Sequence, residues 1–63
     1  MQVIVDLLLA FGWKRRGDRL TYHRWTFYRE GPWLVFQRES LCMLTIVKYR
    51  NWYDAVMFAE GIS

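Results

Sequence analysis

The segment from Leu20 to Tyr49 constrains the fold of this chain more than any other, because aromatic and β-branched residues dominate it. Such residues favour the pleated surface of a β-strand. Glu30-Gly31-Pro32 interrupts the segment with residues typical of a tight turn, and Glu39-Ser40-Leu41 provides a second interruption. The segment therefore predicts three consecutive antiparallel strands joined by two hairpins.

The order of apolar residues predicts how these strands pair. If Glu30 and Gly31 form the first loop, the facing pairs are apolar: Tyr28 with Trp33, Phe27 with Leu34, and Trp25 with Phe36. If Glu39-Ser40-Leu41 forms the second loop, the facing pairs are Arg38 with Cys42, Phe36 with Leu44, and Leu34 with Ile46. A two-residue second loop would place Leu34 opposite Thr45. We prefer the three-residue loop, because a slip of one residue moves the apolar residues of a strand to the other face.

Alternation along these strands gives the predicted sheet two unlike faces. One is almost purely apolar and should be covered by helices: Trp25, Phe27, Leu34, Phe36, Cys42, Leu44 and Ile46. The other is aromatic, basic and partly polar: Tyr22, Arg24, Thr26, Tyr28, Trp33, Val35, Gln37, Met43, Thr45, Val47 and Tyr49. We expect Cys42 to be a buried thiol with no catalytic role, because the apolar face offers it no cationic or basic neighbour.

Two helices are expected to flank the sheet. The apolar residues of the first, over residues 1–11, have helical spacing, and Gly12 is suited to its C-terminal cap. A strand at Gln2 to Val5 is the alternative, because β-branched residues begin the segment. The predicted fold class is α+β, with a three-stranded antiparallel sheet and two short helices on one face, in the order αβββα.

The second helix is predicted between Tyr49 and Ser63. Asn51 is suited to its N-cap, and Gly61 is suited to end it. Trp52, Val56 and Ala59 share one face that should contact the sheet, which leaves Tyr53 and Glu60 outside.

Length limits the chain, residues 1–63, to a single small domain with a stability of about 3 to 5 kcal/mol. Self-association as a homodimer or a bound partner would add to this stability, so a homodimer is one possible state of the chain. Four Trp residues and an aromatic share of 19% exceed what one thin core can hide. A single cysteine excludes an internal disulfide. The apolar run from Val3 to Phe11 is too short to span a membrane, so we expect a cytoplasmic protein without membrane contact.

A net charge of +3 permits a nucleic acid or an acidic protein as partner without requiring either. Four of the nine cations lie in the segment from Trp13 to Arg19, at Lys14, Arg15, Arg16 and Arg19. This segment is either a solvated connection or a phosphate-contacting loop in which Gly17 permits close approach of the backbone.

The order of helix, basic loop, histidine-bearing strand, two further strands and helix resembles the HicA-type messenger-RNA interferases, whose fold is similar to double-stranded-RNA-binding domains. The matching positions are Leu7 to Phe11, Gly12-Trp13, Arg15-Arg16-Gly17 and His23. In that family the catalytic histidine closely follows the loop glycine, whereas here Asp18 to Tyr22 intervene. The resemblance implies a ribonuclease that uses His23.

Three functions are compatible with these residues. We favour a non-enzymatic protein that binds a protein partner through the aromatic and basic face, because Trp, Tyr and Arg dominate interface energies. In size and style it resembles inhibitors encoded by phages and mobile elements, anti-CRISPR proteins among them. The alternatives are a binding module for single-stranded RNA or DNA and the HicA-like ribonuclease. The candidate binding residues are Tyr22, Arg24, Tyr28, Trp33, Tyr49, Lys14, Arg15, Arg16 and Arg19. No metal or cofactor motif is present in the sequence, and none is expected.

Overall fold

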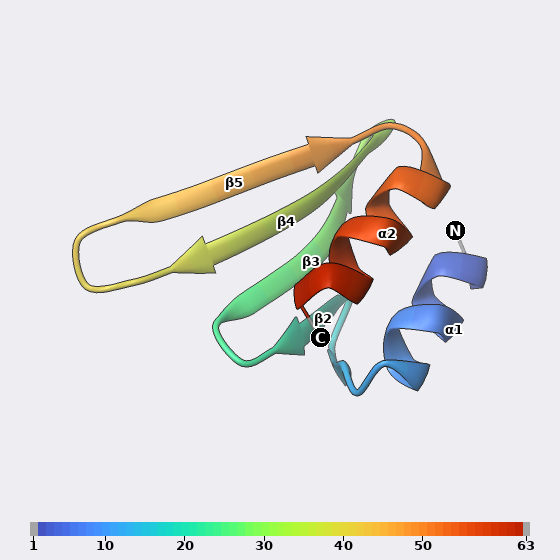
Figure 1. The fold of residues 1–63 in the computed structure, drawn as a ribbon, viewed down its shortest axis with the longest axis horizontal. Helices are drawn as coiled ribbons and strands as arrows, with labels where there is room; N and C mark the ends of the chain where they lie inside the picture. Colours follow the sequence, from blue (N-terminus) through green and yellow to red (C-terminus); the bar gives the residue numbers. More distant parts are fainter. Residues whose placement is uncertain (1, 63) are drawn as a thin grey trace.

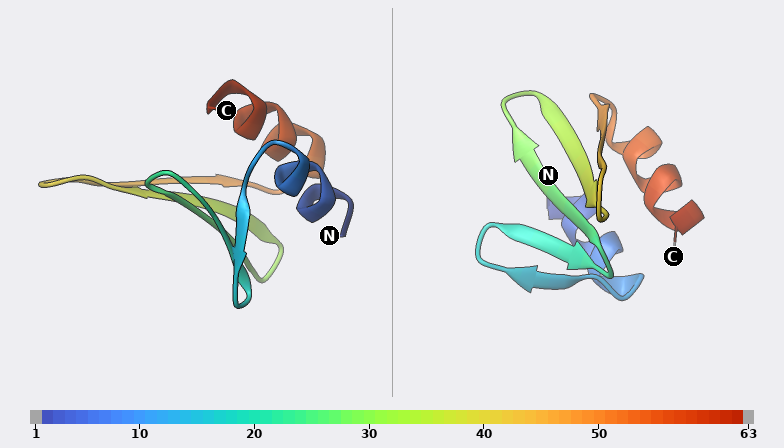
Figure 2. Two further views of the ribbon diagram at one scale, coloured as in Figure 1. Left: turned by 90° about the horizontal axis from the view of Figure 1, so that it is seen from below. Right: turned by 90° about the vertical axis from the view of Figure 1, so that its left-hand side faces the viewer.

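The computed structural model describes residues 2–62 and contains five strands and two helices. In chain order the elements are α1 (Gln2–Ala10), β1 (Lys14–Arg16), β2 (Arg19–Tyr22), β3 (Trp25–Glu30), β4 (Trp33–Glu39), β5 (Leu44–Tyr49) and α2 (Trp52–Ile62). The strands form one antiparallel sheet in the order β1-β2-β3-β4-β5, and both helices lie on the same side of it (Figures 1 and 2). The α+β class is therefore as predicted.

The predicted three-stranded sheet is wrong, because the basic segment forms a hairpin of its own. Lys14 pairs with Thr21, and Arg16 pairs with Arg19 across a turn at Gly17 and Asp18. Gly17 has a φ of 63°, which a two-residue hairpin turn needs at its first position. All three residues of β1 are exposed. Because β1 is held by backbone pairing without burial, its sequence has no apolar alternation that could have indicated a strand.

A second reversal divides the strand that was expected to run from Leu20 to Tyr28. The chain turns at His23 and Arg24, so Tyr22 lies opposite Trp25. His23 takes a φ of 54°, the left-handed conformation that glycine adopts most easily. Neither turn residue is a glycine or a proline, which are the usual sequence signals of a turn. The reversal places Tyr22 on the helix-covered face, whereas it was expected on the open one.

The β3–β4 hairpin has the predicted faces but not the predicted partners. Its turn is Gly31 and Pro32, so Glu30 pairs with Trp33, and Phe27 pairs with Phe36. The predicted register differed by two residues. Because side chains alternate with a period of two, this shift changes each pair and leaves every side chain on its predicted face.

The β4–β5 hairpin has the opposite outcome. Its tip spans residues 40–43 and is closed by backbone hydrogen bonds between Ser40 and Met43, with N···O distances of 2.9 and 3.3 Å. Phe36 consequently pairs with Val47, and Leu34 pairs with Tyr49. The predicted register differed by an odd number of residues, so the face assignment of β5 was inverted. Cys42 is exposed at the tip and is not the buried thiol that was expected.

The helix ends form as their sequences predict. The backbone N–H groups of Gly12 and Trp13 donate to the carbonyls of Leu9 and Leu8, at 3.1 and 3.0 Å, which is the Schellman arrangement. The strand alternative for Gln2 to Val5 is therefore wrong. At α2 the N–H of Tyr53 donates to Oδ1 of Asn51 at 2.7 Å, so the predicted N-cap is confirmed.

The core lies between the helices and one face of the sheet. Its buried members are Ile4, Leu8, Trp13, Leu20, Phe27, Leu34, Phe36, Ala55, Val56 and Ala59. Phe27 and Phe36 are its centre, with ring centroids 4.9 Å apart. From α2, Val56 and Ala59 face the sheet as predicted, whereas Trp52 is half exposed at 50%. Both helices are used to cover one face, which leaves the other face of the sheet open.

Candidate binding surface

The open face of the sheet is the side that neither helix covers. The strand pairings and the alternation of side chains assign its members. They are Lys14, Arg16, Arg19, Thr21, Thr26, Tyr28, Glu30, Trp33, Val35, Gln37, Glu39, Leu44, Ile46 and Lys48. Val35 is fully buried although it lies on this face, between its pairing partners Tyr28 and Lys48.

Two aromatic side chains on the open face are held by arginines. The guanidinium carbon of Arg19 lies 4.3 Å from the ring centroid of Tyr28, and the Tyr28 hydroxyl donates to Oε1 of Gln37 at 3.4 Å. The guanidinium carbon of Arg50 lies 5.5 Å from the ring centroid of Trp33. Such contacts fix the orientation of the rings and contribute about 0.5 to 1 kcal/mol each at exposed sites.

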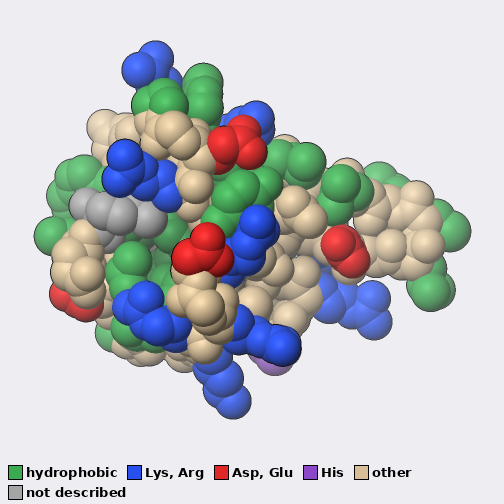
Figure 3. Space-filling view, turned by 180° about the vertical axis from the view of Figure 1, so that it is seen from behind, with side chains coloured by type: hydrophobic (Ala, Val, Ile, Leu, Met, Phe, Trp, Pro, Cys, Tyr) green, Lys and Arg blue, Asp and Glu red, His purple; other side chains and the backbone are tan. Residues whose placement is uncertain are grey.

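The open face carries both signs of charge. The β1–β2 hairpin brings Lys14, Arg16 and Arg19 onto it, and Lys48 adds a fourth cation. Nζ of Lys48 lies 3.8 Å from Oε1 of Glu30. Figure 3 shows Lys and Arg side chains spread over the body of this face, with acidic side chains among them. The surface is therefore more basic than the sequence predicted, but it is not uniformly cationic.

The β4–β5 hairpin extends beyond both helices (Figure 1). Several side chains at its end are apolar and exposed. Leu41 is 100% exposed, Met43 68%, Leu44 55% and Ile46 47%. Leu44 and Ile46 lie on the open face, and the tip continues that apolar strip past the edge of the body, as Figure 3 shows on the right. We call these four residues the apolar arm. Exposed apolar residues that adjoin one another in this way are typical of an interaction site.

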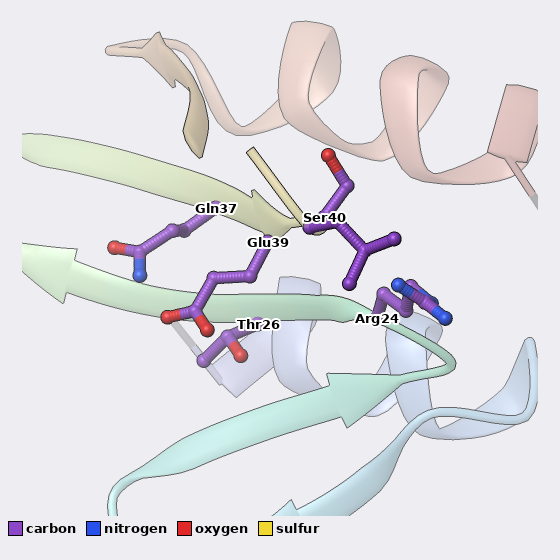
Figure 4. A pocket seen from close by; sticks show the side chains of 6 residues that line it. Arg24, Thr26, Gln37, Glu39 and Ser40 are labelled. Atoms are coloured by element: carbon purple, nitrogen blue, oxygen red, sulfur yellow. The ribbon is translucent and has the colours of Figure 1, made fainter. Parts of the chain in front are cut away.

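A shallow hollow of about 480 Å³ lies where the apolar arm meets the open face (Figure 4). Its lining consists of Arg24, Thr26, Gln37, Glu39, Ser40 and Leu41. One cation and one anion face it, together with hydroxyl and amide groups, so the hollow offers both donors and acceptors. Such a mixture matches a polypeptide backbone better than it matches a row of phosphates.

The structure brings together some of the predicted binding residues and separates others. Tyr28, Trp33, Lys14, Arg16 and Arg19 share the open face, and Arg24 lies at its rim in the β2–β3 turn.

Tyr22, Tyr49 and Arg15 are placed differently. Tyr22 stacks on Trp13 at 5.4 Å between centroids, and Tyr49 contacts Phe36 and Phe58, so both tyrosines belong to the helix-covered side. Arg15 alternates with Lys14 and Arg16 and belongs to the same side as Tyr22, although it is exposed.

Sequence reasoning missed the apolar arm. Leu44 and Ile46 were expected in the core, because the second hairpin was given the wrong loop length. The sequence contained a signal for it. In Ser40 to Met43 three consecutive apolar residues follow a serine, which departs from the alternation expected of a strand with one buried face and is compatible with an exposed apolar turn.

Other kinds of site are not found in the part of the chain that the structure describes. Within residues 2–62 no group of three or more His, Cys, Asp or Glu side chains could hold a metal ion. Over the same range, no helix has both the length and the apolar character needed to cross a bilayer.

In comparisons with known proteins, no family model, no curated protein and no solved structure matches the chain.

Proposed function

We propose that this chain is a small non-enzymatic binding protein that engages a protein partner through the open face and the apolar arm. The observation that carries this proposal is the exposure of Leu41, Met43, Leu44 and Ile46 on a hairpin that extends beyond the body of the domain. Burying a leucine, isoleucine or methionine side chain contributes about 1.5 to 3 kcal/mol. Four adjoining side chains of this kind contribute about 6 to 12 kcal/mol, which is of the order of the roughly 4 to 15 kcal/mol that association costs.

The polar part of the open face also favours a protein partner. Glu30 and Glu39 lie among the cations, and an acidic side chain in a nucleic-acid groove would repel phosphates. Trp33 and Tyr28, each held by an arginine, are side chains of the kind that dominate protein interfaces.

An inhibitor of a cellular enzyme is one form that this function would take, in keeping with the resemblance in size and style to anti-CRISPR proteins. An inhibitor needs only a stable surface that blocks its target, and a 63-residue chain can provide one. A second copy of the chain is a further form. Strand β5 is an outer strand of the sheet, so its free edge could pair with the same edge of another molecule.

The experiment compares two aspartate substitutions on one strand. Ile46→Asp places a negative charge on the open face of the sheet. Thr45→Asp, one residue earlier in the same strand, places the same charge on the opposite face. Both residues are exposed, so both variants should fold like the wild type. Affinity capture from nuclease-treated source cells, with light scattering at two concentrations for the dimer, should show that Ile46→Asp loses its partner and Thr45→Asp keeps it. Equal binding by both variants would contradict the proposal.

Binding of single-stranded nucleic acid is the second candidate, and one observation favours it. The β1–β2 hairpin places Lys14, Arg16 and Arg19 on the open face beside Tyr28, so cations and a ring for base stacking adjoin each other. Capture that disappears after nuclease treatment, together with a steep loss of affinity for an oligonucleotide as salt rises, would favour this candidate over the first.

A further inference from the structure

A second cleft lies at the end of the sheet where α1 and the start of α2 meet the β3–β4 turn. It encloses about 240 Å³, and its lining includes Ile4, Arg29, Gly31, Leu34, Arg50 and Trp52. In the sheet, Leu34 pairs with Arg29 on one side and with Tyr49, the residue before Arg50, on the other. Leu34 therefore lies between the two strands that carry the arginines to the cleft. These arginines were not among the binding residues that the sequence predicted.

Both arginines are held in place without a carboxylate partner. Nε of Arg29 donates to the carbonyl oxygen of Gly31 at 3.0 Å, which leaves the two terminal amino groups of its guanidinium free of that bond. Arg50 lies over the Trp33 ring at 5.5 Å. Within residues 2–62 the ion pairs are Arg19 with Asp18 and Lys48 with Glu30, so neither cleft arginine is neutralised. A guanidinium with unused donors is suited to forked hydrogen bonds with an oxyanion.

The floor of the cleft is apolar. Ile4 and Leu34 are 1% and 7% exposed, and Trp52 forms a wall that is half exposed. A ligand for this cleft therefore needs an anionic group for the arginines and an apolar group for the floor. The volume is smaller than the 300 Å³ or so at which pockets for drug-sized ligands begin, so it matches one apolar side chain.

We infer that this cleft binds the C-terminal residue of a polypeptide, with the α-carboxylate on Arg29 and Arg50 and an apolar side chain against Ile4 and Leu34. A phosphodiester supplies the negative charge but no apolar group beside it, so it matches only half of the cleft. The N-terminus of α2 has no part in the inference, because Asn51 already accepts a hydrogen bond from one of its N–H groups. Arg50 also holds Trp33 of the open face, so Arg29→Gln is the variant that separates this inference from the proposed function.

The test is an NMR titration of the full chain with N-acetyl-leucine, and with N-acetyl-leucine amide as the matched neutral probe. The acid should shift the backbone signal of Gly31 and the indole signal of Trp52, with saturation in the millimolar range expected of so small a ligand. The amide should bind at least about tenfold more weakly, because it lacks the charge that strengthens hydrogen bonds to arginine. Equal shifts with acid and amide would overturn the inference.

Substitutions then locate the site. Arg50→Gln and Arg29→Gln should each weaken binding of the acid by about tenfold or more. Arg38→Gln removes an exposed arginine of β4 that does not line the cleft, and it should leave binding unchanged. Dispersed amide signals in each variant show that it is folded, and Arg50→Gln keeps the Arg29 bond to Gly31 in case Arg29→Gln disturbs the turn. Unchanged binding in both cleft variants, or inorganic phosphate binding as tightly as N-acetyl-leucine, would refute a site for a C-terminal residue.

Discussion

The two outer hairpins of the sheet differ in what protects them. The β1–β2 hairpin is short and has a cation at every residue of β1, whereas the β4–β5 hairpin is longer and carries the apolar arm. Charged residues on an outer strand prevent it from pairing with other molecules, and an exposed apolar outer strand invites such pairing. In β5 only Lys48 is charged. The difference shows that the β1 edge of the sheet is suited to remain in water and that the β5 edge is suited to be covered by another molecule.

The largest expected effect concerns binding by the two hairpins. Replacing Leu41 and Met43 by serine should weaken binding of the partner by about 2 kcal/mol or more, because both side chains are exposed and free to act as anchors. Replacing Arg15 and Arg16 by serine in the other hairpin should change it by less than about 1 kcal/mol. Calorimetric titration of the captured partner would measure both.

A larger loss of binding in the Arg15 and Arg16 variant than in the Leu41 and Met43 variant would contradict the contrast between the two hairpins. It would show that the cationic hairpin carries the binding energy, and it would favour nucleic acid or an acidic protein surface as the partner. Thermal unfolding of each variant provides the control, since neither change removes a buried side chain.

The next effect concerns how each hairpin turns. Gly17→Ala should lower the free energy of unfolding by about 1 to 2 kcal/mol, because its φ of 63° is unfavourable for alanine even though a Cβ there would meet nothing within 4 Å. Leu41→Ala at the other tip should change stability by less than about 0.5 kcal/mol, because the side chain is fully exposed. Urea unfolding would measure both, and equal losses would mean that backbone conformation does not distinguish the turns.

A smaller effect is expected at the β2–β3 turn, which uses a histidine where the β1–β2 and β3–β4 turns use glycine. His23→Gly should raise the free energy of unfolding by about 0.5 kcal/mol, because release of the left-handed strain exceeds the added freedom of the unfolded glycine. The contact of His23 with the Tyr22 ring, at 4.4 Å between centroids, is lost in exchange.

The same variant tests the ribonuclease alternative. Strained residues are often found at functional sites, so the left-handed φ of His23 is compatible with a role in catalysis. Incubation of messenger RNA with the wild type and with His23→Gly would decide: cleavage by the wild type that the variant lacks would favour the HicA-like enzyme, and no cleavage by either would leave the turn as a structural feature.

The smallest effect concerns salt. If the open face binds single-stranded nucleic acid, Arg16→Gln should reduce the slope of log affinity against log salt by about 1, because one phosphate contact is lost. Asp18→Asn, at the turn of the same hairpin, is the matched control and should not reduce the slope. Fluorescence anisotropy of a labelled oligonucleotide would measure it, and a slope near zero in the wild type would remove this candidate.

Part of the fold could be predicted from individual residues. Gly12 and Asn51 end and begin helices as their chemistry requires, and the faces of β3 and β4 followed from alternation alone. The candidate surface was predicted only in part. Tyr28 and Trp33 were placed on the open face because a register error of two residues leaves faces unchanged, whereas Tyr49 was misplaced by an odd error.

Local residue preferences determined the two helices and the three strands between Trp25 and Tyr49. Backbone conformation there responds to side-chain type over a few residues. Only the tertiary structure decided that Lys14 to Arg16 form an outer strand and that four residues close the β4–β5 tip. The physical reason is that both features depend on backbone hydrogen bonds between exposed segments. Such bonds do not require any particular side chain, so the sequence by itself does not decide which exposed segments they join.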